Sequence, residues 1–110
     1  SVTGVQTCAL PISKLTNRSS NGTWFHDTVI KTTVNKLTKA LGEAQIIGND
    51  GKDKVNFDWT CETENGDIFT IYDWKEYRVL DLDEVIEFHI GSKSKTVDEE
   101  AVKELLEILD

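Results

Sequence analysis

Apolar and polar residues alternate along residues 54–62, which read KVNFDWTCE. Such alternation predicts a half-buried β-strand, because successive side chains of a strand point to opposite faces. Asn65-Gly66 follows and predicts a hairpin closed by a type I′ turn, whose two central residues take positive φ. Residues 67–74 predict the returning strand. This run has large residues on both faces, so we expect it in the middle of the sheet.

Two other segments repeat their apolar residues at helical spacing. Residues 27–41 predict a helix with Asp27 as its N-cap and Gly42 as its C-cap. Residues 97–109 predict a second helix, which a capping box would open at Thr96.

A further strand is predicted at residues 85–90, and a weaker one at residues 45–47. The predicted fold class is therefore α+β: a small antiparallel sheet of three or four strands, with an N-terminal and a C-terminal helix packed on one face. The opposite face would stay open to solvent, ligand or another subunit. This single domain would span residues 23–110.

Residues 1–22 are expected to lie outside this domain, as a non-native or disordered segment. Residues 1–12, SVTGVQTCALPI, carry no charge. They resemble the peptide that a sequencing-library adapter gives when it is translated at the end of a metagenomic contig. Residues 13–22 are polar and turn-rich. The alternative interpretation is a genuine N-terminal arm.

The chain has 110 residues, the size of one domain, and a formal net charge of −8. This charge argues against a nucleic-acid polymer as partner, because Lys and Arg drive binding to the phosphate backbone. A small anionic ligand needs only a local cationic pocket. No apolar run approaches the ~20 residues of a membrane span, and the N-terminus lacks the pattern of a signal peptide. We therefore expect no membrane partner, and free thiols at Cys8 and Cys61 in a reducing compartment.

The sequence lacks the residue sets that metal binding and catalysis need. His26 and His89 are far apart and no paired cysteines accompany them, which argues against a metal site. Cys61 lies in register with apolar strand residues, which favours a core thiol over a nucleophile. No glycine-rich phosphate loop is present. We therefore expect no enzymatic activity and no cofactor.

Aromatic and cationic residues gather in the stretch 69–92 of this acidic chain. Rings can stack on a nucleotide base for roughly 1–3 kcal/mol each, and Lys and Arg can hold phosphate. The candidate ligand-binding residues are Trp74, Lys75, Tyr77, Arg78, His89, Lys93 and Lys95. Core packing of the rings and simple solubility for the cations remain the alternatives. The two ends of the stretch need not share one pocket and could converge across a subunit interface, so we expect a homo-oligomer.

Four motifs in this part of the chain occur together: Asp58-Trp59, Asn65-Gly66, TIYDWK at residues 70–75 and FHIG at residues 88–91. In this order they resemble a group of small bacteriophage proteins, and the resemblance covers residues 29–109. That group is similar to phage sponge proteins, which sequester the nucleotide second messengers of CBASS or Thoeris immunity.

The resemblance implies a non-enzymatic protein of the host bacterial cytoplasm. It would bind a small anionic nucleotide-like ligand, either a cyclic oligonucleotide or an ADP-ribose-derived signal, in a pocket completed by oligomerisation. Two positions depart from the group: Phe88 stands where Trp is common, and Ser92 replaces a second glycine. If the amides of this loop contact phosphate, Ser92 would change the choice of ligand.

A second interpretation is an acidic phage accessory protein that binds and inhibits a host protein, for example by mimicking nucleic acid. Asp81, Asp83 and Glu84, together with the C-terminal helix, would supply its acidic surface. The net charge favours this interpretation, whereas the clustered aromatic residues do not.

Overall fold

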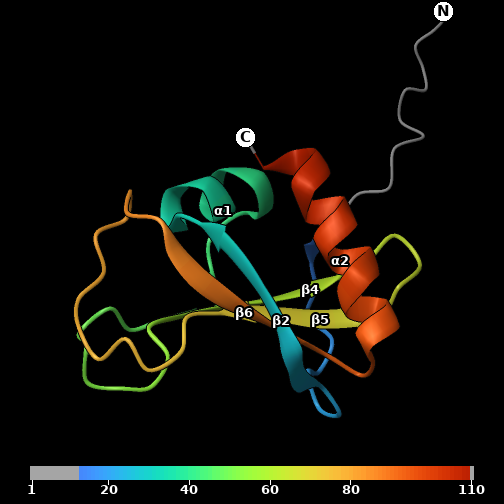
Figure 1. Ribbon diagram of the computed structural model, residues 1–110, viewed down its shortest axis with the longest axis horizontal. Helices are drawn as coiled ribbons and strands as arrows, with labels where there is room; N and C mark the ends of the chain where they lie inside the picture. The colour runs from blue at the N-terminus through green and yellow to red at the C-terminus, as the bar shows by residue number, and fades with distance from the viewer. Residues whose placement is uncertain (1–12, 110) are drawn as a thin grey trace, which may run out of the picture.

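The chain folds into a six-stranded antiparallel sheet with both helices on one side (Figure 1). The computed structural model describes residues 13–109. The strand order is β1-β4-β5-β6-β2, and β3 pairs with β4 beside β1. The strands are β1 (Lys14–Leu15), β2 (Trp24–Thr32), β3 (Ile46–Ile47), β4 (Phe57–Glu62), β5 (Ile68–Tyr72) and β6 (Ile86–Ser92), and the helices are α1 (Val34–Leu41) and α2 (Lys95–Ile108).

The prediction of three or four strands between two terminal helices is wrong. The sheet has six strands, and α1 follows β2 instead of opening the domain. The two-residue strand β1 comes from a segment that we expected to be loose; it pairs with β4. The prediction for residues 1–12 lies outside the described residues, as does Cys8.

The largest error is the helix predicted over residues 27–41, because its first half is strand β2. Residues 24–33, WFHDTVIKTT, are mostly β-branched or aromatic, and such side chains fit a pleated sheet better than a helix. Asp27 is therefore not the N-cap; it sits at a bulge in β2 with φ of 65°. Thr33 caps α1 instead, since its hydroxyl accepts from the Lys36 amide at 3.0 Å. Gly42 ends α1 as predicted.

The β4–β5 hairpin and the central position of β5 are confirmed. The turn type is different, because only Gly66 has positive φ, at 85°. The Gly66 amide donates to the Thr63 carbonyl at 2.8 Å. This geometry fits a type I turn followed by a glycine in the left-handed region.

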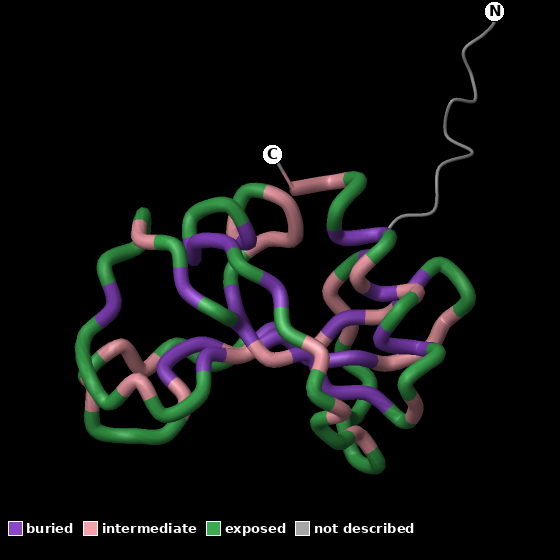
Figure 2. Tube along the Cα trace, viewed as in Figure 1, coloured by how far each residue is buried: buried purple, intermediate pink, exposed green. Residues whose placement is uncertain are grey.

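The core lies between the sheet and the two helices, where buried positions concentrate in Figure 2. The alternation along β4 is confirmed, because Phe57, Trp59 and Cys61 are all buried there. The Trp59 indole donates to the carbonyl of Gly42 at 3.0 Å and so joins β4 to the end of α1. The other face of the sheet carries no helix in the described part of the chain (Figure 1).

Helix α2 begins two residues before the predicted start, and its N-cap is Ser94. The Ser94 hydroxyl accepts from the Val97 amide at 3.3 Å, whereas Thr96 is exposed in the first turn.

We expect Ser94→Ala to lower the free energy of unfolding by about 1 kcal/mol, because an amide of the first turn loses its partner. Thr96→Ala is the matched control and should change stability by less than about 0.5 kcal/mol in the same urea titration. Equal losses in the two variants would contradict this assignment.

Candidate ligand-binding site

A row of aligned side chains crosses the helix-free face of the sheet, here called the open face. The strand registers place Val29 opposite His89, His89 opposite Tyr72, Tyr72 opposite Asp58, and Asp58 opposite Ile46. Directly opposed residues of neighbouring strands share a face and lie close enough to touch. The open face therefore places an imidazole, a phenol and a carboxylate side by side at its centre.

Four rings pack together on this face, and we call them the ring cluster: Phe25, Tyr72, Trp74 and His89. Phe25 stacks on His89, with centroids 4.0 Å apart and planes 12° apart. Tyr72 meets His89 and Trp74 edge-on, with centroids 5.5 and 6.0 Å apart. Phe25 and Trp74 remain 39% and 38% exposed, so each offers a free ring surface to a ligand.

Gly91 makes room for this packing. A Cβ at this position would lie 2.9 Å from the Thr70 hydroxyl oxygen and 3.6 Å from Cε1 of Tyr72. The FHIG motif is therefore part of strand β6, where the missing side chain lets the Tyr72 ring lean over the backbone. Ser92 is fully buried and its hydroxyl donates to Asp98, which fixes the start of α2. The expected role of Ser92 in the choice of ligand has no support in this position.

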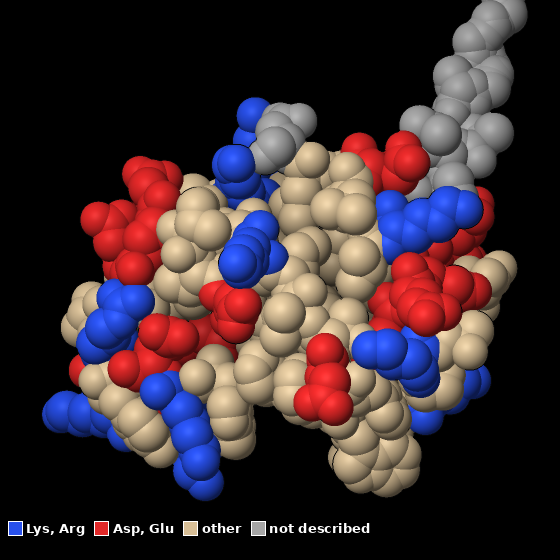
Figure 3. Space-filling model, in the orientation of Figure 1, with Lys and Arg blue, Asp and Glu red and all other residues tan. Residues whose placement is uncertain are grey.

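Two ammonium groups stand beside the ring cluster. The Nζ atoms of Lys75 and Lys54 lie 5.5 and 5.9 Å from the centre of the Trp74 ring. Both lysines are exposed, and neither has a carboxylate partner among residues 13–109. In the space-filling view, basic side chains lie on the left side of an indentation in the lower outline of the molecule, and uncharged residues form its right side (Figure 3). Rings and unpaired cations thus occur together on the open face.

Partial burial controls the ionisation of the ring cluster. Burial lowers the pKa of His89, and the nearby Glu87 offsets only part of this effect. The imidazole is therefore uncharged at neutral pH and stacks as a neutral ring. Burial also raises the pKa of Tyr72, with a smaller contribution from Asp58. Positive charge at this site therefore comes from Lys54 and Lys75.

Asp58 is an unpaired carboxylate at the edge of the ring cluster. Its Oδ1 atom is enclosed and has no hydrogen-bond partner in the described part of the chain. Burial, with a contribution from the charge of Asp73, raises the pKa of Asp58 to about 6. An unpaired, partly buried carboxylate destabilises a fold, so such groups are candidates for a functional role.

We expect Asp58→Asn to stabilise the protein at pH 7 by about 1 kcal/mol, after allowance for solvent screening. The pKa of Asp58 is about 6 in the folded protein against 3.8 for the free group. The folded state therefore binds this proton more tightly, and the stability it contributes is present below pH 3.8 and lost as the pH rises through 6. Urea titrations of both proteins from pH 4 to pH 7 check this expectation. His89 titrates in both, so the difference between them isolates Asp58. If the difference in free energy of unfolding between the two proteins is the same from pH 4 to pH 7, the result would contradict this expectation.

Three of the seven predicted site residues come together in one chain: Trp74, Lys75 and His89. The Trp74 and His89 rings lie 6.2 Å apart, so no subunit interface is needed to join them. Lys93 and Lys95 have other contacts. Lys93 pairs with Asp67 at 3.1 Å, and the Lys95 ammonium donates to the His26 carbonyl at 3.1 Å beside the bulge of β2.

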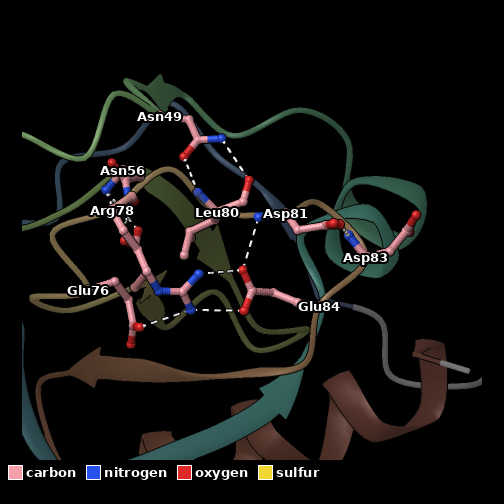
Figure 4. A network of polar contacts seen from close by, with 9 residues as sticks. Asn49, Asn56, Glu76, Arg78, Leu80, Asp81, Asp83 and Glu84 are labelled. Carbon is pink, nitrogen blue, oxygen red and sulfur yellow. Dashed lines mark hydrogen bonds and ion pairs between the residues drawn. The ribbon is translucent and has the colours of Figure 1, made fainter.

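Tyr77 and Arg78 lie in the loop between β5 and β6. Tyr77 is 52% exposed, with φ of 51°. The Arg78 guanidinium donates to both oxygens of Glu84, at 2.7 and 2.8 Å, and contacts Glu76 at 3.4 Å (Figure 4). Its charge is thus neutralised within the loop, which it holds together.

Sequence reasoning missed four residues of this site: Phe25, Lys54, Asp58 and Tyr72 as a ligand contact. Phe25 lies just before the segment taken for a helix, which hid its place on β2. The alternation along residues 54–62 places Asp58 on the polar face of its strand, opposite Phe57 and Trp59. The signal that could have found Phe25 is the strand character of residues 24–32, since it adds a strand beside His89.

A hollow of about 390 Å³ lies between α1 and the loops at one end of the sheet. Its lining is mostly apolar and includes Val34, Ile47, Phe57 and Leu82. Glu43 is the charged residue among those that line it. This hollow offers no cation, so it suits an anionic ligand less well than the open face does.

Other chemistry is limited in residues 13–109. No group of three or more His, Cys, Asp or Glu side chains in this range could hold a metal ion. Cys61 is a free, fully buried thiol, and burial raises its pKa far above the usual range, so the predicted core thiol is confirmed. Neither described helix combines the length and apolar character that crossing a bilayer requires.

Comparison with known proteins found no family model, no curated protein and no solved structure that matches this chain.

Proposed function

We propose that this chain is a phage-encoded, non-enzymatic sponge that sequesters a nucleotide second messenger and thereby blocks bacterial anti-phage immunity. It would act in the cytoplasm of the host. The observation that carries the proposal is the ring cluster with Lys54 and Lys75 beside it on the open face. The resemblance of the IYDWK and FHIG motifs to small phage proteins points the same way.

The chemistry of the open face suits a ligand with a flat ring and a negative charge. A base can stack on the free surface of Trp74 or Phe25, for roughly 1–3 kcal/mol per base. The two unpaired ammonium groups can hold a phosphate near Trp74. They raise the local potential although the whole chain carries a net charge of −8.

We also propose that the protein is a homo-oligomer whose second copy completes the receptacle. The open face is only partly enclosed, and β2 is an edge strand that pairs with β6 alone among the described strands. The exposed Trp24 and Val29 extend the apolar surface along this edge. Sedimentation with and without ligand would check this, and a monomer in both conditions would contradict it.

The test is a calorimetric titration of the purified protein with a panel of cyclic dinucleotides, cyclic trinucleotides and cyclic ADP-ribose isomers. The proposal expects at least one member to bind with a submicromolar Kd. The ligand should be recovered unchanged after the protein is denatured by heat. No binding below micromolar across the panel would overturn the proposal. Recovery of an altered ligand would indicate an enzyme instead.

The acidic accessory protein remains the second candidate, because the net charge favours it. Its proposed acidic residues are partly engaged within the protein: Glu84 pairs with Arg78 (Figure 4), and Asp83 accepts from the side-chain Nδ2 of Asn35 at 2.7 Å. Acidic and basic side chains are also interspersed on the face drawn in Figure 3. A host protein retained by this chain at high salt, without any nucleotide binding, would favour this candidate.

A further inference from the structure

Asp58 lies where it can form hydrogen bonds with the edge of a base that stacks on the ring cluster. It lies directly opposite Tyr72 on the open face, and Tyr72 contacts both Trp74 and His89. The Asp58 carboxylate therefore lies on the open face of the sheet, beside the ring cluster. Lys54 and Lys75, by contrast, are exposed beside the outer ring, Trp74.

The carboxylate accepts no hydrogen bond within residues 13–109. Oδ1 is enclosed without a partner, whereas Oδ2 is not enclosed and also has none. Asp73, whose charge acts on Asp58, accepts hydrogen bonds from the backbone and side chain of Asn56 and from the Phe57 amide. Of the two carboxylates, Asp58 is therefore the one with free acceptor atoms. An N–H group of a ligand can reach Oδ2 directly, and it can reach Oδ1 after the carboxylate rotates.

We infer that the site selects a guanine base, with Asp58 accepting hydrogen bonds from N1–H and the 2-amino group of that base. This inference rests on the proposed function. A carboxylate is an acceptor with two oxygens, and it binds two parallel N–H donors in a forked arrangement. Guanine presents such a pair along its Watson–Crick edge. Adenine presents the lone pair of N1 in the same place, which faces the carboxylate unfavourably.

The positions of the charges decide which end of a nucleotide meets Asp58. A phosphate beside a carboxylate is repelled, and a phosphate beside Lys54 and Lys75 is attracted. The base edge lies at the opposite end of a nucleotide from its phosphate. With phosphate at the exposed lysines, the base edge is therefore the part that points to the half-buried carboxylate.

The test compares three cyclic dinucleotides that differ only in their bases: cyclic di-GMP, cyclic di-IMP and cyclic di-AMP. Binding to the full chain is measured by calorimetry at pH 7.5, where Asp58 is ionised. We expect cyclic di-GMP to bind at least about 10-fold more tightly than cyclic di-AMP, which matches one forked hydrogen-bonded contact. Cyclic di-IMP keeps N1–H but lacks the 2-amino group, so it should fall between them. The 2′-deoxy form of cyclic di-GMP should bind as tightly as the ribose form.

Two variants complete the test. Asp58→Asn should reduce the preference for guanine to less than about 3-fold, because an amide offers one donor and one acceptor. Glu62→Gln is the matched control, since it removes one charge from the same strand and face, four residues further along. It should keep the preference of the parent protein. Urea titration confirms that both variants are folded.

The results distinguish two claims: the selection of guanine by Asp58 and the proposed function. Equal binding of cyclic di-GMP and cyclic di-AMP by the parent protein would overturn the inference and leave the proposed function in place. The same holds if Asp58→Asn keeps the preference for guanine, because another group would then select the base. No binding of any dinucleotide would overturn the inference, and the wider panel then decides the proposed function.

Discussion

Asp73→Ala is expected to lower the free energy of unfolding by about 3–5 kcal/mol, the largest effect of a single change that we expect in this protein. Asp73 is fully buried at the end of β5. Its carboxylate accepts from the Asn56 amide at 2.9 Å, from the Asn56 side chain at 3.1 Å and from the Phe57 amide at 2.8 Å. Alanine leaves the two backbone amides buried without this partner, whereas the Asn56 side chain keeps its hydrogen bond to the Arg78 carbonyl. Each such donor destabilises by about 1–3 kcal/mol, and the effects are not fully additive.

The consequences of this change extend to the site. Asn56 also donates to the Arg78 carbonyl at 3.1 Å, so Asp73 orients the residue that joins two loops beside the ring cluster (Figure 4). Gly51 lies in the first of these loops, where a Cβ would come within 2.8 Å of the Arg78 backbone. The loops are therefore closely packed, and loss of Asp73 loosens the position of Trp74 and Lys75.

Urea titration and calorimetry measure this effect, with a fall in Tm of at least about 12 °C expected for a domain of this size. Asp73→Asn keeps one acceptor oxygen and should lose about half as much free energy. Asp53→Ala is the control, because Asp53 is exposed in the neighbouring loop, and it should change stability by less than about 0.5 kcal/mol. An Asp73→Ala protein that unfolds like Asp53→Ala would show that these hydrogen bonds do not hold the loops.

Trp74→Ala is expected to weaken ligand binding by at least about 5-fold, because one stacked base is worth roughly 1–3 kcal/mol. It should also lower stability by about 1 kcal/mol, since the ring contacts Tyr72 and His89 and is only partly exposed. Lys75→Ala should weaken binding by about 5-fold at low salt and have little effect on stability.

The two variants thus separate binding from packing. Lys36→Ala, an exposed lysine on α1, removes the same charge away from the open face and should leave binding unchanged. Binding is measured by calorimetry and stability by thermal unfolding. Equal losses of Tm in Trp74→Ala and Lys75→Ala would make Lys75 a structural residue. Unchanged binding in both would remove the ring cluster from the site.

The pattern of the sequence identified the elements that bury one continuous apolar stripe. Strands β4, β5 and β6 and helix α2 were predicted within a few residues, because alternation and helical spacing are local signals. Strand β2 was missed because Val29, Ile30 and Val34 fit a helical spacing, although they belong to a strand and the helix after it. Only the pairing of Ile30 with Phe88 across the sheet decides between the two.

The candidate site was predictable only in part, for the same reason. Trp74, Lys75 and His89 stood out as aromatic and cationic residues in one hairpin, and they do come together. The contact of Phe25 with His89 depends on a strand pairing that no local pattern contains. The cations at Arg78 and Lys93 looked similar to Lys75 in the sequence, but each has a carboxylate partner that only the fold brings near.

The central claim is that the ring cluster receives a small nucleotide-like anion, and the three tryptophan indole N–H signals in an NMR titration test it most directly. Trp74 lies in the ring cluster, Trp59 is buried with its indole bonded to Gly42, and Trp24 is exposed outside the cluster. On addition of the nucleotide that binds best in calorimetry, we expect the Trp74 signal to move strongly and the Trp59 signal to stay in place. Saturation of binding with an unmoved Trp74 signal would place the ligand elsewhere and contradict this account.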